Sequence, residues 1–579
     1  MSADLQAAGG RPAGIREFTL RSVLAGIVVA AVIGVSYPYM VLKFGFGPNI
    51  SVVSAFFGFI ALGLFSRSYN RWENNIVQTA GTSAGQVAFI CWLFAAFDML
   101  AADPTSGFTV KLGSLQIFVW MTVAGLLGVL LAVPFRNHYV VDEQLPFPDG
   151  VAAAQTLVVL DSRGPAARQA AFAMIGSMLA SGSLMLATSR AWLAEVLRID
   201  FNRYSGAGGV GFAVSLLGIG AGLIIGIRIC ISMLLGTLFA WVIAPPLLGA
   251  AGAIPAQATR TQILLWVMWP AVGVMIAGGL TALALKWRSV ARSFNALRAA
   301  GSRTGDFPLR WVWLSCSALT VLLAIVQQVM VGTPYWQTLV AVVLAFPLML
   351  VGLRVMGETN WGPISIMTNF TQALFGALVP GNISAGAVPS GITASVASGS
   401  EGLMQDYKTG ELIGATPRLL TYMQLIAVPV GAAALAVIYP LLRDTYGVGE
   451  GGQLSSPTSV RWVGFARILS QGFAALPPGA LTALVAGSLV GVLLTFMELH
   501  PRLRKFVPAP GAVAIGMVIP ASAVFTIFVG GVLEWLWRRW HATSFARFGI
   551  AVASGLIAGD ALVAVALPIL YFFGMVKPV

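Results

Sequence analysis

The chain has 579 residues, of which 58% are hydrophobic and only 9% are charged. Because a water-soluble protein carries roughly 25% charged residues, this composition excludes a chain whose whole surface faces water. The net charge is +13, but Lys and Arg lie mainly in short breaks between apolar segments. That distribution is typical of membrane topology signals and argues against nucleic-acid binding. The three cysteines are far apart in apolar segments and lack metal-ligand spacing.

Apolar segments recur along the chain, each long enough to cross the ~30 Å hydrocarbon core of a bilayer. Before the centre we predict spans near residues 22–40, 49–66, 76–97, 115–133, 168–188, 209–226, 229–248 and 262–285. After it we predict spans near residues 311–331, 336–352, 362–379, 419–442, 480–497, 511–531 and 547–572. Three short or broken stretches are predicted as half-helices or re-entrant segments: 147–160, 385–398 and 463–476. The pattern predicts an all-α polytopic membrane protein.

Basic residues predict the orientation. The segment 1–18 carries Arg11 and Arg16, and the loop 286–310 is rich in Lys and Arg. Cytoplasmic loops attract such residues, so we expect both segments in the cytoplasm. They delimit a first transmembrane half at 19–285 and a second at 311–579. The expected location is the plasma membrane, which is the inner membrane in a Gram-negative cell.

A weak internal repeat relates the two halves. Residues 47–52 resemble residues 362–366, and a polar stretch follows each of them at a similar offset. Internal duplication with interrupted helices is typical of secondary transporters. The span count predicts antiparallel repeats, although one misassigned re-entrant segment would reverse this, and a chance match stays open because the motif is short.

The first two polar clusters lie at 73–86 and 142–155. In the first, amides and hydroxyls share one helix face, which can bind peptide-like groups; hydrogen bonding between helices is the alternative. In the second, Pro146, Pro148 and Gly150 break the helix beside acidic residues. A freed helix N-terminus attracts a carboxylate, whereas a cytoplasmic loop that caps a helix is the competing interpretation.

The other two clusters are adjacent, at 369–400 and 401–418. The first is rich in Ser, Thr and Asn and is interrupted by Pro380, Gly381, Pro389 and Gly391. It is too polar for a lipid-facing helix, so it predicts a cavity lining. In the second, Asp406 with Lys408, or Glu411 with Arg418, are expected to pair. Charge pairs that break and re-form can couple protons to conformational change, and a solvated loop is the alternative.

These segments resemble the oligopeptide transporter family, which includes the yellow-stripe-like metal-chelate transporters. The resemblance rests on SYPYM at 36–40, GPN at 47–49, ENNIVQT at 73–79, QLPFPDG at 144–150, and QDYKTG and GATPR within 405–418. It extends from about residue 18 to residue 573, and lean loops make the chain more similar to a prokaryotic member. The resemblance implies about 14–16 helices, a homodimer, and proton-coupled uptake of small peptides or metal chelates of peptide-like acids.

The leading hypothesis is a proton-driven symporter for oligopeptides or peptide-like and metal-chelate compounds, working by alternating access. The residues predicted to bind substrate are Asn75, Gln78, Thr79, Gln86, Gln155, Asn369, Ser390, Thr393 and Ser398. The residues predicted to carry protons or act as gates are Glu73, Asp149, Glu401, Asp406 and Lys408. No resident cofactor or metal is predicted, and the partners are lipid, substrate, protons and a second copy.

Two alternatives stay open. A passive channel or pore for small solutes would give fluxes that do not saturate. An intramembrane enzyme would need a catalytic pair at one depth, but the chain has no mid-span histidine and no paired mid-span aspartates, and it lacks Walker, nucleophile-elbow and His-Glu metalloprotease motifs. The sequence therefore predicts no enzyme. Asp560 lies alone in a span, where it must be neutralised, paired or in contact with water.

Overall fold

The structure is a computed structural model. It describes residues 14–44, 50–65, 69–161, 165–200, 204, 206, 209–285, 307–449, 452, 454, 456–470, 476–500, 502–503 and 506–572. Most of the predicted cytoplasmic segment 1–18 and of the loop 286–310 lies outside these residues, as does the first part of the 47–52 motif.

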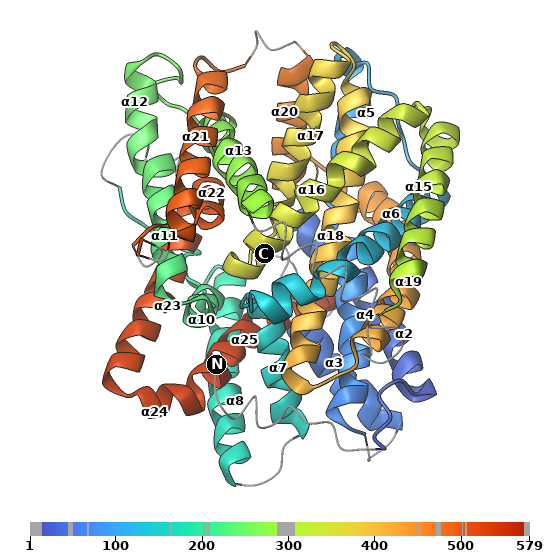
Figure 1. Ribbon diagram of the computed structural model, residues 1–579, viewed down its shortest axis with the longest axis vertical. Coiled ribbons are helices and arrows are strands. Elements are labelled where there is room, and N and C mark those ends of the chain that lie inside the picture. The colour runs from blue at the N-terminus through green and yellow to red at the C-terminus, as the bar shows by residue number, and fades with distance from the viewer. Residues whose placement is uncertain are drawn as a thin grey trace.

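The helices form two bundles that lie side by side (Figure 1). The first bundle contains α2 (Leu20–Phe44), α3 (Ile50–Phe65), α4 (Arg71–Phe89), α5 (Cys91–Ala102), α6 (Ser114–Ala132), α7 (Pro148–Asp161), α15 (Leu309–Val331), α16 (Tyr335–Thr359), α17 (Ile364–Leu378), α18 (Ile383–Ile413), α19 (Pro417–Tyr446) and α20 (Pro457–Ser470). Within it α4 packs on α2 and α19, and α18 packs on α6, α16 and α17.

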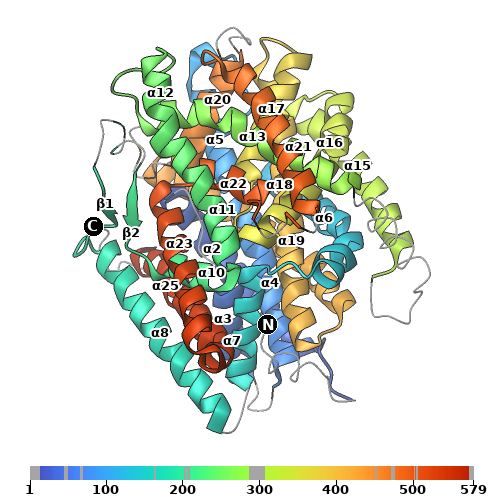
Figure 2. The same ribbon diagram turned by 60° about the vertical axis from the view of Figure 1, so that its left-hand side comes forward.

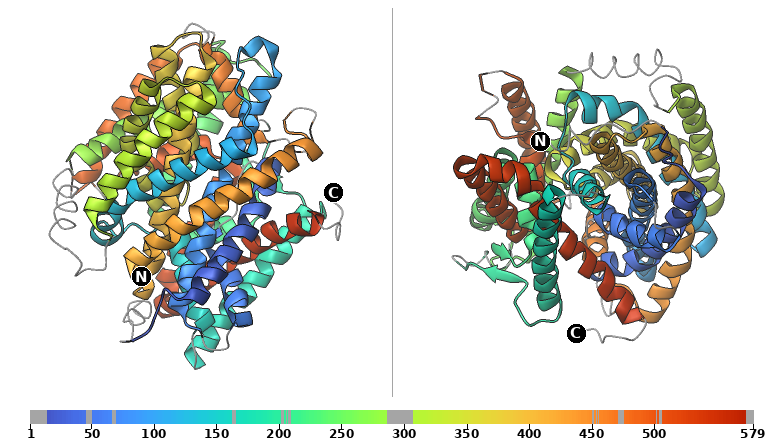
Figure 3. Two further views of the ribbon diagram at one scale, coloured as in Figure 1. Left: turned by 90° about the vertical axis from the view of Figure 1, so that its right-hand side faces the viewer. Right: turned by 90° about the horizontal axis from the view of Figure 1, so that it is seen from below.

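The second bundle contains α8 (Pro165–Ser189), α10 (Leu216–Ile225), α11 (Ile227–Leu238), α12 (Ala244–Ala250), α13 (Arg260–Leu285), α21 (Ala480–Leu499), α22 (Pro510–Val518), α23 (Ala521–Trp540), α24 (Ala542–Ser544) and α25 (Ile550–Phe572). Its main contacts join α13 to α21, α8 to α25, and α10 to α23. Strands β1 (Val196–Arg198) and β2 (Gly211–Ala213) pair antiparallel at its edge (Figure 2). Seen from below, its green, teal and red helices lie beside the first bundle (Figure 3).

The two bundles are interleaved along the chain. Residues 14–161 build part of the first bundle and residues 165–285 part of the second. The second half of the chain repeats this order, because residues 307–470 return to the first bundle and residues 476–572 to the second. Each half of the chain therefore contributes helices to both bundles.

Among the described residues, 12 helices are long and apolar enough to cross a membrane. Three shorter apolar helices correspond to α3, α10 and α17. This confirms the predicted all-α polytopic membrane protein. The predicted short segment 147–160 corresponds to α7, and the part of 463–476 up to residue 470 lies in α20; each helix has 14 residues. At 1.5 Å per residue such a helix is about 21 Å long and too short to cross the bilayer. Residues 471–475 lie outside the described residues.

Three sequence predictions of helix breaks and spans were wrong. The stretch 385–398 is not a half-helix, because α18 runs without interruption through Pro389 over 31 residues; proline is tolerated in membrane helices whose neighbours satisfy the freed backbone group. The predicted span 511–531 is two helices, since Pro520 cannot continue α22 and leaves Ile519 extended. The predicted span 209–226 begins with β2 and contains only the short α10.

Candidate functional site

Helix α18 forms the centre of the first bundle. It contacts α4, α6, α7, α16, α17, α19 and α20. Every residue of this helix is buried except Ser384 and Glu411. The predicted alternative of a solvated loop is therefore wrong for residues 401–413. Polar and charged side chains are costly inside a membrane protein unless they have partners, so the contacts of α18 identify the candidate site.

Asp406 lies at a junction of helices α4, α18 and α19. Its side chain is fully buried. The amide of Gln78 on α4 donates a hydrogen bond of 2.7 Å to Asp406 Oδ1, and the amide of Gln424 on α19 donates one of 2.5 Å to Oδ2. Within the described part of the chain no cation pairs with this carboxyl group. Two neutral amides from different helices hold it instead.

The Asp406 junction extends to α3 through hydroxyl groups. The amide nitrogen of Gln78 also donates to Thr82 Oγ1 over 2.8 Å, and that hydroxyl lies 3.3 Å from Ser51 Oγ. The carbonyl oxygen Oε1 of Gln78 is buried without a hydrogen-bond partner. The network thus links four helices and leaves one acceptor beside Asp406 unused.

The loop before α7 packs against the end of α16. Gln144 and Phe147 adopt positive φ angles of 49° and 41°. The backbone N–H of Phe147 donates to Gly357 O at the end of α16 over 2.9 Å. Asp149 and Asn360 form a reciprocal pair, in which Asn360 Nδ2 donates to Asp149 Oδ1 over 2.6 Å and Asp149 N donates to Asn360 Oδ1 over 3.0 Å. Asp149 is thereby fixed at the start of α7.

Gly150 places the start of α7 directly against α18. Its N–H donates to Gln405 Oε1 over 2.8 Å, and its carbonyl accepts from Thr409 Oγ1 over 3.1 Å. A Cβ at this position would lie 2.6 Å from Gln405 O and 2.9 Å from Lys408 Cβ. Only glycine permits this approach, because real Cβ atoms do not come within 3.0 Å of such atoms.

Glu401 is a second buried carboxyl group of α18. Its exposed fraction is 3%, and Oε1 has no hydrogen-bond partner. The group faces the connection between α16 and α17, where a Cβ on Gly362 would lie 2.1 Å from Glu401 Oε2. A permanent charge without a partner is costly at such a position, which makes Glu401 a candidate for reversible protonation.

The predicted substrate-binding residues lie on α4, α7, α17 and α18, mostly where these helices pack against one another. Ser398 donates to Gln86 Oε1 over 2.9 Å, and the hydroxyls of Thr393 and Thr371 are 3.0 Å apart. Ser390 is satisfied by its own helix through Ala387 O. Four further polar atoms are buried without a partner: Asn75 Nδ2, Asn75 Oδ1, Thr79 Oγ1 and Asn369 Oδ1. Gln155 is half-buried on α7 and makes no hydrogen bond to the described residues.

Two expected charge pairs on α18 are not formed. Residues two apart on a helix point in different directions, so Lys408 does not contact Asp406 and is buried near Gly150 instead. Glu411 pairs with Arg136 over 2.5 Å, which replaces the expected pair with Arg418. Glu73 is also paired: its carboxylate accepts bonds of 2.7 and 2.6 Å from Arg21 and a further one from Thr19.

A charged cluster between the two bundles was not predicted from the sequence. Arg354 on α16 pairs with Glu143 over 2.9 Å and with Glu358 over 3.1 Å. Opposite it, Arg228 pairs with Glu498 over 3.0 Å in the second bundle. A cavity with about 310 Å³ of empty space, including its open mouth, lies between them and is lined by α13, α16, α21 and α22. Arg354 and Glu358, four residues apart in an apolar segment, were the available signal.

Two more residues of the site were overlooked: Gln424 and Asn360. Gln424 lies alone in an apolar span, and Asn360 adopts a left-handed conformation at the end of α16. Within the part of the chain that the structure describes, no group of three or more His, Cys, Asp and Glu residues is arranged to hold a metal ion.

The helices and the buried polar centre define a multi-pass, all-α membrane protein. The family model described as OPT oligopeptide transporter protein matches residues 17–571. The chain belongs to this family. The rice protein (Oryza sativa subsp. japonica) named probable metal-nicotianamine transporter YSL16 is 25% identical, over 93% of this chain and 89% of its own length.

A second relative is the putative oligopeptide transporter YGL114W of Saccharomyces cerevisiae, which is 23% identical over 95% of both chains. A third is the rice protein named probable metal-nicotianamine transporter YSL6, 23% identical over 95% of this chain and 91% of its own length. The family and these names indicate a transporter rather than an enzyme.

Proposed function

We propose that this chain is a secondary active transporter that couples the uptake of oligopeptides, or of metal chelates of peptide-like acids, to protons. The names of its relatives supply both substrate classes. The observation that carries the proton coupling is the Asp406 junction, a fully buried carboxyl group held by two amides and no cation.

The junction can exist in two hydrogen-bonded states. With Asp406 ionised, both of its oxygens accept from amide nitrogens. When a proton binds, one oxygen becomes a donor and needs an acceptor. In the structure Gln78 Oε1 has no hydrogen-bond partner. A half-turn of the Gln78 amide would bring this oxygen to the protonated Asp406 as the acceptor. Protonation therefore changes the contact between α4 and α18, and this change is how we propose that proton binding reaches the helices around the substrate.

The two bundles provide the moving parts that alternating access requires. They meet through close contacts, such as those of Gly279 with Val351 and Gly511 with Val355. The charged cluster around Arg354 lies along the same boundary. Alternating access in many transporters is a rigid-body rocking of one bundle against another, and we propose that motion here, in a homodimer with a cytoplasmic N-terminus.

Substrate would bind along the buried polar surfaces of α4, α17 and α18. Amide and hydroxyl groups of Asn75, Thr79, Gln86, Thr393 and Ser398 match the donors and acceptors of peptide bonds. Gln78, Gln155, Asn369 and Ser390 complete the proposed lining. Asp149, Glu401, Glu73 and Lys408 stay candidates for further proton carriers or gates.

Purified protein in proteoliposomes tests the proposal. Uptake of trialanine and of the iron(III)–nicotianamine chelate is measured with an inside-alkaline pH gradient, and again after a protonophore collapses it. We expect gradient-driven accumulation of at least one substrate, and its loss with the protonophore. If neither substrate accumulates under the gradient, or if accumulation survives the protonophore, proton coupling is wrong.

A further inference from the structure

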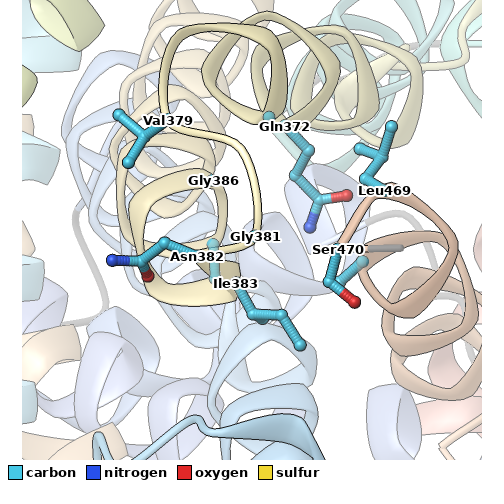
Figure 4. Close-up of a pocket in the computed structure, with 11 residues that line it drawn as sticks. Gln372, Val379, Gly381, Asn382, Ile383, Gly386, Leu469 and Ser470 are labelled. Carbon is cyan, nitrogen blue, oxygen red and sulfur yellow. The ribbon is translucent and has the colours of Figure 1, made fainter. Parts of the chain in front are cut away.

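A pocket lies where α17 turns into α18, against the end of α20 (Figure 4). It has about 270 Å³ of empty space, including its open mouth. Its lining includes Gln372, Gly376, Asn382, Gly386, Leu469 and Ser470. Among the described residues no acidic side chain lines it, and neither the Asp406 junction nor the charged cluster between the bundles contributes to it.

Gln372 is the first sign of a ligand. Its exposed fraction is 1%, and both Nε2 and Oε1 are without a hydrogen-bond partner. In Figure 4 the amide extends from α17 into the space between the α17–α18 turn and Ser470. Buried polar groups in native proteins nearly always have partners, because an unmade hydrogen bond costs stability. An amide that points unpaired into a pocket therefore indicates a bound partner.

The N-terminus of α18 is the second sign. Gly381, with φ of 77°, turns the chain into the helix, and Asn382 caps it by accepting from Ala385 N over 3.1 Å. This cap satisfies one of the free N–H groups that begin every helix. The others, together with the dipole of a 31-residue helix, favour a negatively charged group.

We propose that this pocket binds the carboxylate end of an amino-acid-derived ligand. The carboxylate lies at the N-terminus of α18, and the adjoining peptide group pairs with the donor and acceptor of Gln372. The ligand class follows from the proposed function. The pocket adds a docking position far from the Asp406 junction: α18 is about 46 Å long, and its far end lies beside Trp72, which donates to Ile413 O. With the N-terminus in the cytoplasm, the pocket opens on the outer face.

Binding to the full chain in lipid nanodiscs tests this site by isothermal titration calorimetry. The probes are trialanine and trialanine amide, which lacks the terminal carboxylate. We expect trialanine amide to bind at least about tenfold more weakly than trialanine, because it cannot make the charge-assisted hydrogen bond of the terminal carboxylate. Gln372→Leu removes the unpaired amide and is expected to weaken trialanine binding by a similar factor. Because it also removes two unsatisfied atoms, the melting temperature should not fall.

Gln327 on α15 provides a matched control. It is equally buried, and both of its amide atoms also lack partners, but it does not line the pocket. Gln327→Leu should leave trialanine binding unchanged. Gly386→Ala narrows the pocket, and its Cβ meets nothing closer than 3.4 Å, so it should weaken binding as Gln372→Leu does.

Three results would overturn the site: equal affinity for the two peptides, no binding of trialanine to the wild type, or the same binding in Gln372→Leu and Gln327→Leu. These failures differ from failure of the proposed function. If uptake does not respond to a pH gradient, proton coupling is wrong, but the pocket can still bind trialanine. If Gln372→Leu does not change trialanine binding, the pocket is wrong, but uptake can still be coupled to protons.

Discussion

The two bundles differ in what they bury. The first buries carboxyl, amide and ammonium groups of Glu73, Gln78, Glu401, Asp406 and Lys408 among others. The buried polar residues of the second bundle are mostly Ser and Thr, with Glu534 and Asp560 as its buried acids among the described residues. Its helices meet instead through glycines that bring backbones together. We therefore propose that the first bundle carries the proton and substrate chemistry and that the second moves against it as a rigid body without supplying chemistry.

One buried aspartate from each bundle gives the largest expected difference between them. Asp406 accepts from two amides, whereas Asp560 accepts from the Ser215 hydroxyl over 2.7 Å. Asp406→Asn keeps the shape but cannot exchange a proton, so we expect complete loss of pH-driven trialanine uptake in proteoliposomes. Asp560→Asn should retain uptake. If Asp406→Asn accumulates peptide as the wild type does, or if only Asp560→Asn fails, the chemistry is assigned to the wrong bundle.

The boundary between the bundles is probed by Arg354→Gln. The change leaves the buried Glu358 and the half-buried Glu143 without their shared cation. Breaking a buried pair in this way costs about 3–5 kcal/mol, to be measured as a loss of unfolding free energy in a denaturant titration. The exposed pair of Arg467 with Asp103 is the control, and Arg467→Gln should cost at most about 1 kcal/mol. Equal losses would mean that the Arg354 cluster is solvated.

Gly559→Ala tests whether the second bundle acts only through its packing. A Cβ on this residue of α25 would lie 2.0 Å from Met178 O of α8, so the two helices must separate. We expect a loss of about 1–3 kcal/mol of stability, with uptake per folded molecule unchanged. Gly176→Ala on α8 meets nothing within 4 Å and should be neutral or slightly stabilising. A folded Gly559→Ala protein that no longer transports would contradict a passive frame.

Much of the fold was predictable because a membrane helix must satisfy its own backbone and show an apolar face. The errors occur where tertiary contacts override local signals. Pro389 and Gly391 suggested a break in α18, but a helix surrounded on all sides by others stays intact. The extended backbone at Ile519 came from Pro520, a signal that the length of the apolar run concealed. The interleaving of the bundles has no local signal at all.

The candidate site was predictable in its residue types and not in its pairings. Clusters of amides, acids and small residues indicated α4, α7 and α18, whose polar side chains the structure brings together. The partner of Asp406 was expected two residues away at Lys408, yet it lies on α4 and α19, at Gln78 and Gln424. Contacts between helices that are hundreds of residues apart depend on packing that one sequence does not display. The same reason hid the cluster around Arg354.

The interleaving has a consequence for how the protein is made. Gln78 enters the membrane early, but Gln424 lies 346 residues later (424 − 78). At ribosomal speeds of about 5–20 residues per second, the α4 amide waits roughly 20–70 s for its partners. During that interval the polar face of α4 is present in the bilayer before its hydrogen bonds exist. Because unpaired polar groups are costly in a membrane, we expect the newly made first bundle to need temporary partners, such as water, lipid headgroups or an insertion chaperone, until α18 and α19 arrive.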